Sequence, residues 1–191
     1  MSLRIIGGEM RGRALKSPRS TSIRPTTGIL RKSVFDICKE IITDANFLDL
    51  FAGTGAMGIE ALSRGAAHAT FVDQDREALL CIRKNLETLK LEERGTIFKG
   101  DAPQVLRRFE EQKKTFDIIY IDPPYHEDHY HPEILALLDS SPIAKGATIF
   151  VEEATPSRWE KEKIPLRNLV LKSTRRFGRS ILFQYLSRSL L

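Results

Sequence analysis

Residues 48–58 read LDLFAGTGAMG, an apolar run that leads into three glycines and then into a helix-like pattern. The glycines follow the spacing Gly53-x-Gly55-x-x-Gly58. Glycine adopts turn dihedrals that other residues avoid, and it lets ligand atoms approach the backbone closely. The spacing alone is a weak signal, but the strand before it and the helix after it strengthen it. This stretch predicts the strand–turn–helix unit with which α/β proteins hold a nucleoside cofactor.

The rest of the chain alternates between strand-like and helical segments. Residues 75–90 carry a helical stripe of apolar residues, and strand-like runs lie at 46–51, 67–73, 95–98, 116–122 and 147–153. Such alternation predicts a parallel sheet covered by helices on both faces. Two further strand-like runs, 168–174 and 180–186, are separated only by RRFGR, so we expect them to be antiparallel neighbours.

The N-terminal region has a different composition. Residues 1–27 are rich in Arg, Gly, Pro, Ser and Thr, and two short strand-like stretches, 3–6 and 13–16, are joined by GGEMRG, which predicts a hairpin. An apolar stripe over 28–42 then predicts a helix. We therefore divide the 191 residues into a basic N-terminal extension, 1–27, and one α/β domain, 28–191.

Composition is that of a soluble protein, with 41% apolar and 29% charged residues. No apolar run approaches the roughly 18–20 residues of a membrane-spanning helix, and the N-terminus does not resemble a secretory signal. The two cysteines, Cys38 and Cys81, both fall at apolar-facing positions of expected helices. A disulfide framework is therefore not expected, and we predict a cytoplasmic protein with no membrane partner.

Charge is distributed unevenly along the chain. Residues 1–32 hold eight Lys/Arg and one acid, and residues 156–191 hold nine and two, so each end carries +7. The region between them carries −9, within a net charge of +5. Two basic ends around an acidic body favour a polyanionic partner such as nucleic acid, although an uneven solvated surface would give the same counts.

Three acids follow successive predicted strands or lie within them. Asp49 precedes the glycines, Asp73 ends the next strand in TFVDQD, and Asp101 follows the third in KGDA. Ligands of such sheets bind outside the carboxyl ends of the strands, where Asp73 could accept from a ribose diol and Asp101 from an adenine amine. The alternative is that these acids only cap helices or turns.

The same features occur in NAD-linked oxidoreductases, which are the main rival class. Asp49 favours S-adenosylmethionine instead, because a carboxylate could help to bind an amino-acid ammonium but would repel a pyrophosphate.

Asp122-Pro123-Pro124-Tyr125 directly follows the apolar run FDIIYI. Two prolines remove two backbone donors and fix two φ angles, so the carbonyl groups are held rigidly as acceptors. An exocyclic amine of a base is a poor nucleophile, and we expect the Asp122 carboxylate and the Pro123 carbonyl to accept its two N–H bonds. Tyr125 could stack on the base. This pattern indicates methylation of a base amine, whereas the alternative is a proline turn with a packed tyrosine.

Residues 126–131, HEDHYH, contain three histidines near acids. Their spacing matches no zinc pattern, so we predict a solvated lid or substrate loop and no metal site.

On these residues the chain resembles the RsmD family, which methylates guanine N2 in 16S ribosomal RNA. The resemblance covers nearly the whole length and includes RIIGGEMRGR (4–13), RPTTGILRKSVF (24–35), LDLFAGTGAMGIEALSRGA (48–66), FVDQDREAL (71–79) and IDPPY (121–125). It implies a Rossmann-like methyltransferase fold with a seven-stranded, mostly parallel sheet. The last strand, SILFQYL, would be antiparallel.

The resemblance also implies a set of functional residues and partners. S-adenosyl-L-methionine is the expected cofactor, 16S rRNA alone or within the small subunit or its assembly intermediates is the expected substrate, and a monomer is expected. The implied residues are Asp49, Phe51, Gly53, Gly55, Asp73 and Asp101 for the cofactor, Asp122, Pro123 and Tyr125 for the target amine, and Arg4, Arg11, Arg13, Arg24 and Arg31 for RNA.

Three other hypotheses remain open at this stage. The same DPPY motif serves adenine-N6 or cytosine-N4 methylation, although no separate DNA-recognition domain is visible. The NAD-dependent oxidoreductase and a non-enzymatic RNA-binding assembly factor are the others.

Overall fold

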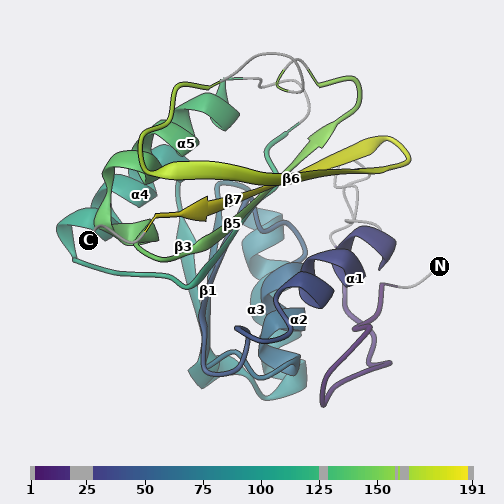
Figure 1. Cartoon of the computed structure of the whole chain (residues 1–191). Coiled ribbons are helices and arrows are strands. Elements are labelled where there is room, and N and C mark those ends of the chain that lie inside the picture. Colours follow the sequence, from purple (N-terminus) through teal and green to yellow (C-terminus); the bar gives the residue numbers. More distant parts are fainter. Residues whose placement is uncertain (1–2, 18–27, 125–128, 158, 160–163, 189–191) are drawn as a thin grey trace.

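A computed structural model describes residues 3–17, 28–124, 129–157, 159 and 164–188 of the chain. Its centre is a seven-stranded sheet in the order β3-β2-β1-β4-β5-β7-β6 (Figure 1). The strands are β1 (Asn46–Leu50), β2 (His68–Asp73), β3 (Gly95–Lys99), β4 (Ile118–Ile121), β5 (Thr148–Ala154), β6 (Leu169–Phe177) and β7 (Ser180–Ser187).

The first five strands are parallel, and β7 pairs antiparallel with both β5 and β6. The reversed last strand and its antiparallel neighbour confirm the expectation for the end of the chain. The strand order reverses between β1 and β4, and in open α/β sheets ligands bind at such a switch point.

In the described part of the chain, five α-helices cover the two faces of the sheet (Figure 1). Buried residues of α1 (Gly28–Ile37), α2 (Ala56–Ser63) and α3 (Arg76–Leu89) form one core cluster with the sheet. Those of α4 (Ala102–Glu111) and α5 (Tyr130–Ser140) form the other, and two 3-10 turns, η1 (Glu92–Arg94) and η2 (Pro142–Ala144), connect elements. The molecule is thus a helix–sheet–helix sandwich, as the alternation predicted.

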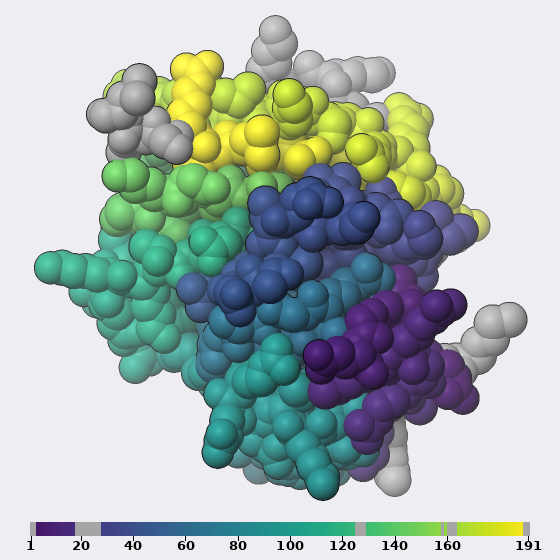
Figure 2. Space-filling view, turned by 60° about the horizontal axis from the view of Figure 1, so that its bottom comes forward, coloured from purple at the N-terminus to yellow at the C-terminus, as the bar shows by residue number. Residues whose placement is uncertain are grey.

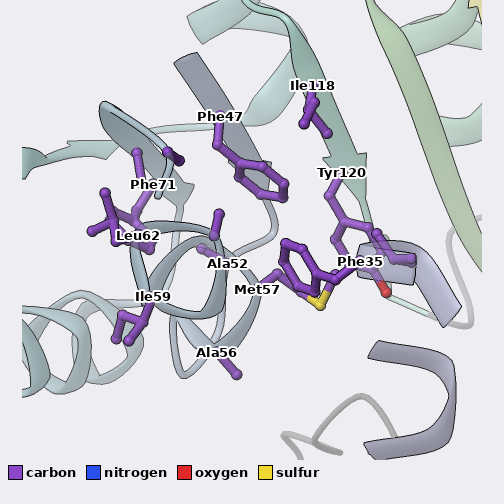
Figure 3. Close-up of a cluster of buried hydrophobic side chains, with 14 of the residues drawn as sticks. Phe35, Phe47, Ala52, Ala56, Met57, Ile59, Leu62, Phe71, Ile118 and Tyr120 are labelled. Atoms are coloured by element: carbon purple, nitrogen blue, oxygen red, sulfur yellow. The ribbon is translucent and has the colours of Figure 1, made fainter. Parts of the chain in front are cut away.

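Strand alternation decides which side chains meet the first helical layer. Phe47, Phe71 and Tyr120 point toward α1 and α2, where Phe35 stacks on Phe47 with ring centroids 6.0 Å apart (Figure 3). By the same alternation, Asp49 and Asp73 lie on this face, two residues beyond Phe47 and Phe71. Polar groups at the ends of the strands are therefore directed to the side of α2 and α3.

The helix predicted over 28–42 is shorter than expected. α1 ends at Ile37, and the chain continues in hydrogen-bonded turns because the amides of Ile41 and Ile42 both donate to the Cys38 carbonyl. Ile41, which belonged to the predicted buried stripe, is 44% exposed.

The N-terminal segment 3–16 folds back on itself and packs against helices. Arg4 and Ala14 form an antiparallel bridge, and Ile5 and Leu15 are buried in the first core cluster. Figure 2 shows this purple segment lying against the blue and teal helical layer. Glu60 of α2 accepts a hydrogen bond from the Ile6 amide at 2.8 Å. The segment is therefore fixed to the α/β body by polar as well as apolar contacts.

Within the described residues, no helix has both the length and the apolar character that crossing a bilayer requires.

Candidate active site

The glycine turn joins β1 to α2 through several residues in the left-handed region. Phe51, Gly53 and Gly55 have φ angles of 59°, 53° and 74°. Gly55 is the N-cap of α2, and the Ala52 amide donates to the carbonyl of Val72 on β2 at 3.0 Å. The positive φ angles explain why glycine is needed here, whereas Phe51 adopts a conformation that is uncommon for a bulky residue. Strained backbone of this kind is often found at ligand sites.

Asp49 lies beneath this turn and is 2% exposed. Its Oδ2 accepts a hydrogen bond from the Gly58 amide in the first turn of α2, at 2.9 Å. Burial raises the pKa of Asp49 to about 8, and the neighbouring Asp73 adds to that rise, while the Gly58 hydrogen bond opposes it. At neutral pH this pKa leaves the carboxyl group largely protonated, and a cation entering the turn would favour its ionised form.

Asp73 and Asp101 stand at the carboxyl ends of β2 and β3. The two Asp73 oxygens accept from the Gly53 and Asp75 amides, each at 2.8 Å, and burial raises the pKa of Asp73. Helix α3 is capped by Asp75, whose Oδ1 accepts from the amides of Glu77 and Ala78. Asp101 is the N-cap residue of α4, but its side chain makes no capping bond. The Asp73–Asp75 bond is a local turn bond, whereas the bond to Gly53 reaches the glycine turn, and capping does not account for Asp101.

Tyr130, the first residue of α5, connects this group to the segment after Asp122. Its hydroxyl donates to Asp101 Oδ1 at 2.7 Å, and its ring packs edge-on against Phe51 with centroids 4.8 Å apart. Tyr130 was not predicted as a site residue. Only its position five residues after Tyr125 could have pointed to it, because its contacts with Asp101 and Phe51 depend on how α5 packs against the sheet.

Asp122 and Pro123 lie where the prediction placed them, directly after β4. The Asp122 amide donates to the carbonyl of Leu50 at 3.4 Å, so Asp122 stands beside the end of β1 and the start of the glycine turn. Asp122 is half-buried and Pro123 is buried. The residues predicted to bind the cofactor therefore meet Asp122 and Pro123 at the carboxyl ends of the strands. Tyr125 lies outside the described residues.

A buried polar pair lies next to this edge. The hydroxyl of Tyr120 on β4 donates to Glu152 on β5, and both residues are almost fully buried. β4 and β5 are paired up to Ile121 and Val151, so Glu152 and Asp122 each follow directly on adjacent strands. Neither Tyr120 nor Glu152 was predicted, because both read as ordinary strand residues.

A residue that contacts RNA must be exposed, but Arg31 is buried. It is 2% exposed on the inner side of α1, where its Nη2 donates to the Arg4 carbonyl at 2.8 Å. Its Nε and Nη1 have no hydrogen-bond partner among the described residues. Burial lowers its pKa, while the nearby Glu60 raises it. Arg31 is buried because it belongs, with Leu30, Val34 and Phe35, to the side of α1 that packs against the rest of the protein.

Arg4, Arg11 and Arg13 are exposed. Arg13 Nη2 donates to the Thr88 carbonyl near the end of α3, and the Glu9 amide donates to the Ser63 carbonyl at the end of α2. Both helices end opposite the edge where β1 and β4 end. Arg4 and Arg11 belong to the same segment, and Arg24 lies outside the described residues.

His131 is not part of a solvated lid, in contrast to the prediction for 126–131. It is buried in α5, where Nδ1 contacts Glu153 and Nε2 lies 3.4 Å from the Tyr185 hydroxyl. His129 is exposed, and His126 lies outside the described residues. Across the described part of the chain, no three His, Cys, Asp or Glu side chains gather as metal ligands would.

The strand order, the reversed β7 and the acids around a glycine turn define a protein with the Rossmann-like methyltransferase fold. The solved structure of yhhF from Escherichia coli is similar, with a TM-score of 0.85 and 33% identity over 99% of each chain. SMU.776, solved as a complex with SAH, has a TM-score of 0.70 at 15% identity and covers 83% of this chain and 48% of its own. This second likeness concerns the fold alone.

The family follows from sequence comparison. The family model described as "Conserved hypothetical protein 95" matches residues 3–186, and the chain belongs to this family. The Escherichia coli (strain K12) protein "Ribosomal RNA small subunit methyltransferase D" is 38% identical over 172 residues, 85% of this chain and 84% of the relative. These matches confirm the resemblance to the RsmD family.

Proposed function

We propose that the protein transfers a methyl group from S-adenosyl-L-methionine to the exocyclic N2 amine of a guanine in 16S rRNA of the small ribosomal subunit. One observation carries this proposal: Asp122 and Pro123 stand beside the glycine turn, with the Asp122 amide bonded to Leu50. A base amine held there would lie next to the cofactor. The name of the Escherichia coli relative supports ribosomal RNA as the substrate.

The donor set fits S-adenosylmethionine better than NAD. Asp49 is buried beneath the turn, where a positively charged amino-acid end would favour its ionised form. An ionised carboxylate at this position would repel a pyrophosphate. Asp73 is suited to a ribose diol and Asp101 to an adenine amine, while Phe51, Gly53 and Gly55 would line the turn. When bound, the cofactor supplies a methyl group on a sulfonium that already reacts readily with nucleophiles.

The residues of the DPPY motif would prepare the amine. The Asp122 carboxylate and the Pro123 carbonyl each accept one N–H of the amine, which directs the nitrogen lone pair away from the ring plane. The N2–C bond forms as the S–C bond breaks, and the amine loses one proton to solvent or to Asp122. Positioning and electrostatics therefore supply most of the rate. In a structured RNA the base must first be unstacked.

The direct test is methyl transfer from labelled S-adenosylmethionine into total RNA and 30S particles from cells that lack this protein, followed by nucleoside analysis. We expect label in N2-methylguanosine of 16S rRNA. Label in adenosine or cytidine would replace guanine N2 with adenine N6 or cytosine N4 as the target.

A second arm separates the methyltransferase from the other classes. Asp122→Ala is expected to keep cofactor affinity and to lose turnover, measured by equilibrium binding and by initial rates. Normal turnover in this variant would remove Asp122 from the mechanism. Binding of NAD without S-adenosylmethionine would indicate an oxidoreductase, and binding of neither would favour an RNA-binding assembly factor.

A further inference from the structure

The C-terminal hairpin formed by β6 and β7 carries a strong positive charge. Residues 164–188 contain six Lys/Arg and no Asp or Glu. Four of the six, Lys172, Arg175, Arg176 and Arg179, lie on β6 or in its turn into β7, and all four are exposed. We propose that the tip of this hairpin, Arg175, Arg176 and Arg179, binds phosphates of the RNA substrate next to the target base. This inference rests on the proposed function.

The strand register places the tip at the catalytic edge of the sheet. β4 and β5 are paired at Ile121 and Val151, and Asp122 follows directly. β5 continues to Ala154, which pairs with Ser180, the first residue of β7 after the turn. Each strand residue adds about 3.3 Å, so the turn between β6 and β7 lies about 10 Å beyond the end of β4, three residues after Val151.

A backbone contact holds the turn at this edge. The Thr155 amide donates to the Arg179 carbonyl at 2.9 Å, which ties the turn to the chain that leaves β5. Three strand spacings separate β4 from β6, which corresponds to about 14 Å across the sheet. Such a separation is comparable to about four or five nucleotides of one strand, at 3.4 Å each.

The tip is also close to α1. Arg175 Nη1 donates to Ser33 Oγ at 3.1 Å, so the Arg175 side chain reaches from β6 to α1. Figure 2 shows the yellow-green hairpin strands directly above the blue helix. The tip is at the substrate half of the sheet, beyond β4, whereas the expected cofactor residues come from β1, β2 and β3.

Arginine suits an RNA backbone in particular. Its planar guanidinium binds phosphate oxygens in a bidentate manner, and it stays charged at every pH of interest. Of the N-terminal arginines, Arg13 bonds the Thr88 carbonyl near the end of α3, away from the hairpin tip. The hairpin tip is therefore suited to contact the RNA phosphates near the target base.

The test uses the full chain with Arg175→Gln, Arg176→Gln and Arg179→Gln combined, and a 16S rRNA transcript as probe. A second variant places Lys at the same three positions. A matched control removes three exposed charges from α3 and α4, with Arg83→Gln, Lys84→Gln and Arg108→Gln. RNA affinity is measured between 50 and 200 mM salt, alongside steady-state methylation and binding of S-adenosylmethionine.

We expect the glutamine variant to raise KM for RNA by about tenfold or more and to lower the salt slope of log K by about 2 to 3. Its cofactor affinity and thermal unfolding should match the wild type, because the three side chains are exposed. The lysine variant should recover most of the salt slope, and the control variant should behave as wild type.

An unchanged RNA KM and salt slope in the glutamine variant, with an active wild type, would overturn the hairpin proposal and leave the proposed function intact. An equal loss in the control variant would also overturn it, because general charge would then explain the effect. If the wild type binds RNA without methylating it, and only the glutamine variant loses binding, the surface stands and the proposed function fails.

Discussion

The Asp49 carboxyl group on β1 accepts a hydrogen bond from the backbone amide of Gly58 in α2, at 2.9 Å and almost fully buried. This bond ties the first turn of the helix to the strand that precedes the glycine turn. One acid thus orients the helix end and also stands where a cationic ligand group would need it.

The pH dependence of stability tests the burial of Asp49. Its native pKa of about 8 lies above the ordinary value of 3.8, so the native state binds more protons than the unfolded state between these values. The free energy of unfolding should therefore fall as pH rises through this window. We expect Asp49→Asn to gain stability over wild type from pH 5 to 8, by up to about 1.4 kcal/mol per pH unit.

Urea unfolding of both proteins at several pH values measures this difference. Asp44→Asn, at an exposed acid, is the matched control for the loss of one negative charge. Parallel stability curves for wild type and Asp49→Asn would show that Asp49 titrates at an ordinary pH.

Gly58 is required by packing rather than by its dihedral angles. A Cβ at this position would lie 2.3 Å from Cε1 of Phe71, so Gly58→Ala must displace either α2 or a buried ring. We expect a loss of about 1–3 kcal/mol in the free energy of unfolding, despite the better helix propensity of alanine. Gly28→Ala is the control, because no described atom lies within 4 Å of its Cβ. Equal stability of the two variants would refute the clash.

Tyr130 should matter for the cofactor more than for the chemistry. Tyr130→Phe removes the hydroxyl that orients Asp101 and keeps the ring against Phe51. We expect affinity for S-adenosylhomocysteine to fall about 2- to 13-fold, which corresponds to the roughly 0.5–1.5 kcal/mol of one hydrogen bond, with a smaller change in kcat. Titration calorimetry and initial rates measure the two effects. An unchanged affinity would mean that Asp101 is oriented without Tyr130.

Arg31 should tolerate an apolar replacement of similar length. Two of its three guanidinium nitrogens have no hydrogen-bond partner among the described residues. Replacing Arg31 also leaves Glu60 its ion pair with Arg64, whose Nε lies 2.8 Å from Glu60 Oε1. We expect Arg31→Met to unfold at the same denaturant concentration as wild type or at a higher one, because an incompletely bonded buried cation is costly. A loss of several kcal/mol would show that the buried charge has a necessary partner.

The central part of the sheet was predictable because strands such as β4 and β5 are largely continuous apolar runs, which is typical of strands buried on both faces. The glycine turn and the DPPY motif were also found, since each is a local pattern next to a strand. The site residues that the sequence missed, Tyr130 and Glu152, come from elements whose approach is decided by packing.

The N-terminal segment illustrates the limit more clearly. The charge of this segment and its hairpin could be predicted from the sequence, but the helices against which it packs could not. Hydrogen bonds from Ile6 to Glu60 and from Lys16 to Asn85 join residues more than fifty positions apart, and no local pattern encodes them. Arg31 was misplaced for the same reason, because a charged residue beside an apolar stripe usually points to solvent.

The position of β6 at the end of the sheet has a consequence for the behaviour of the protein in concentrated solution. An edge strand offers unpaired backbone groups to other chains, and β6 also exposes Val170 and Leu171. Charged side chains are a common protection of such edges against aggregation. Lys172, Arg175 and Arg176 therefore keep neighbouring copies apart by repulsion, and neutralising them should make the protein less soluble.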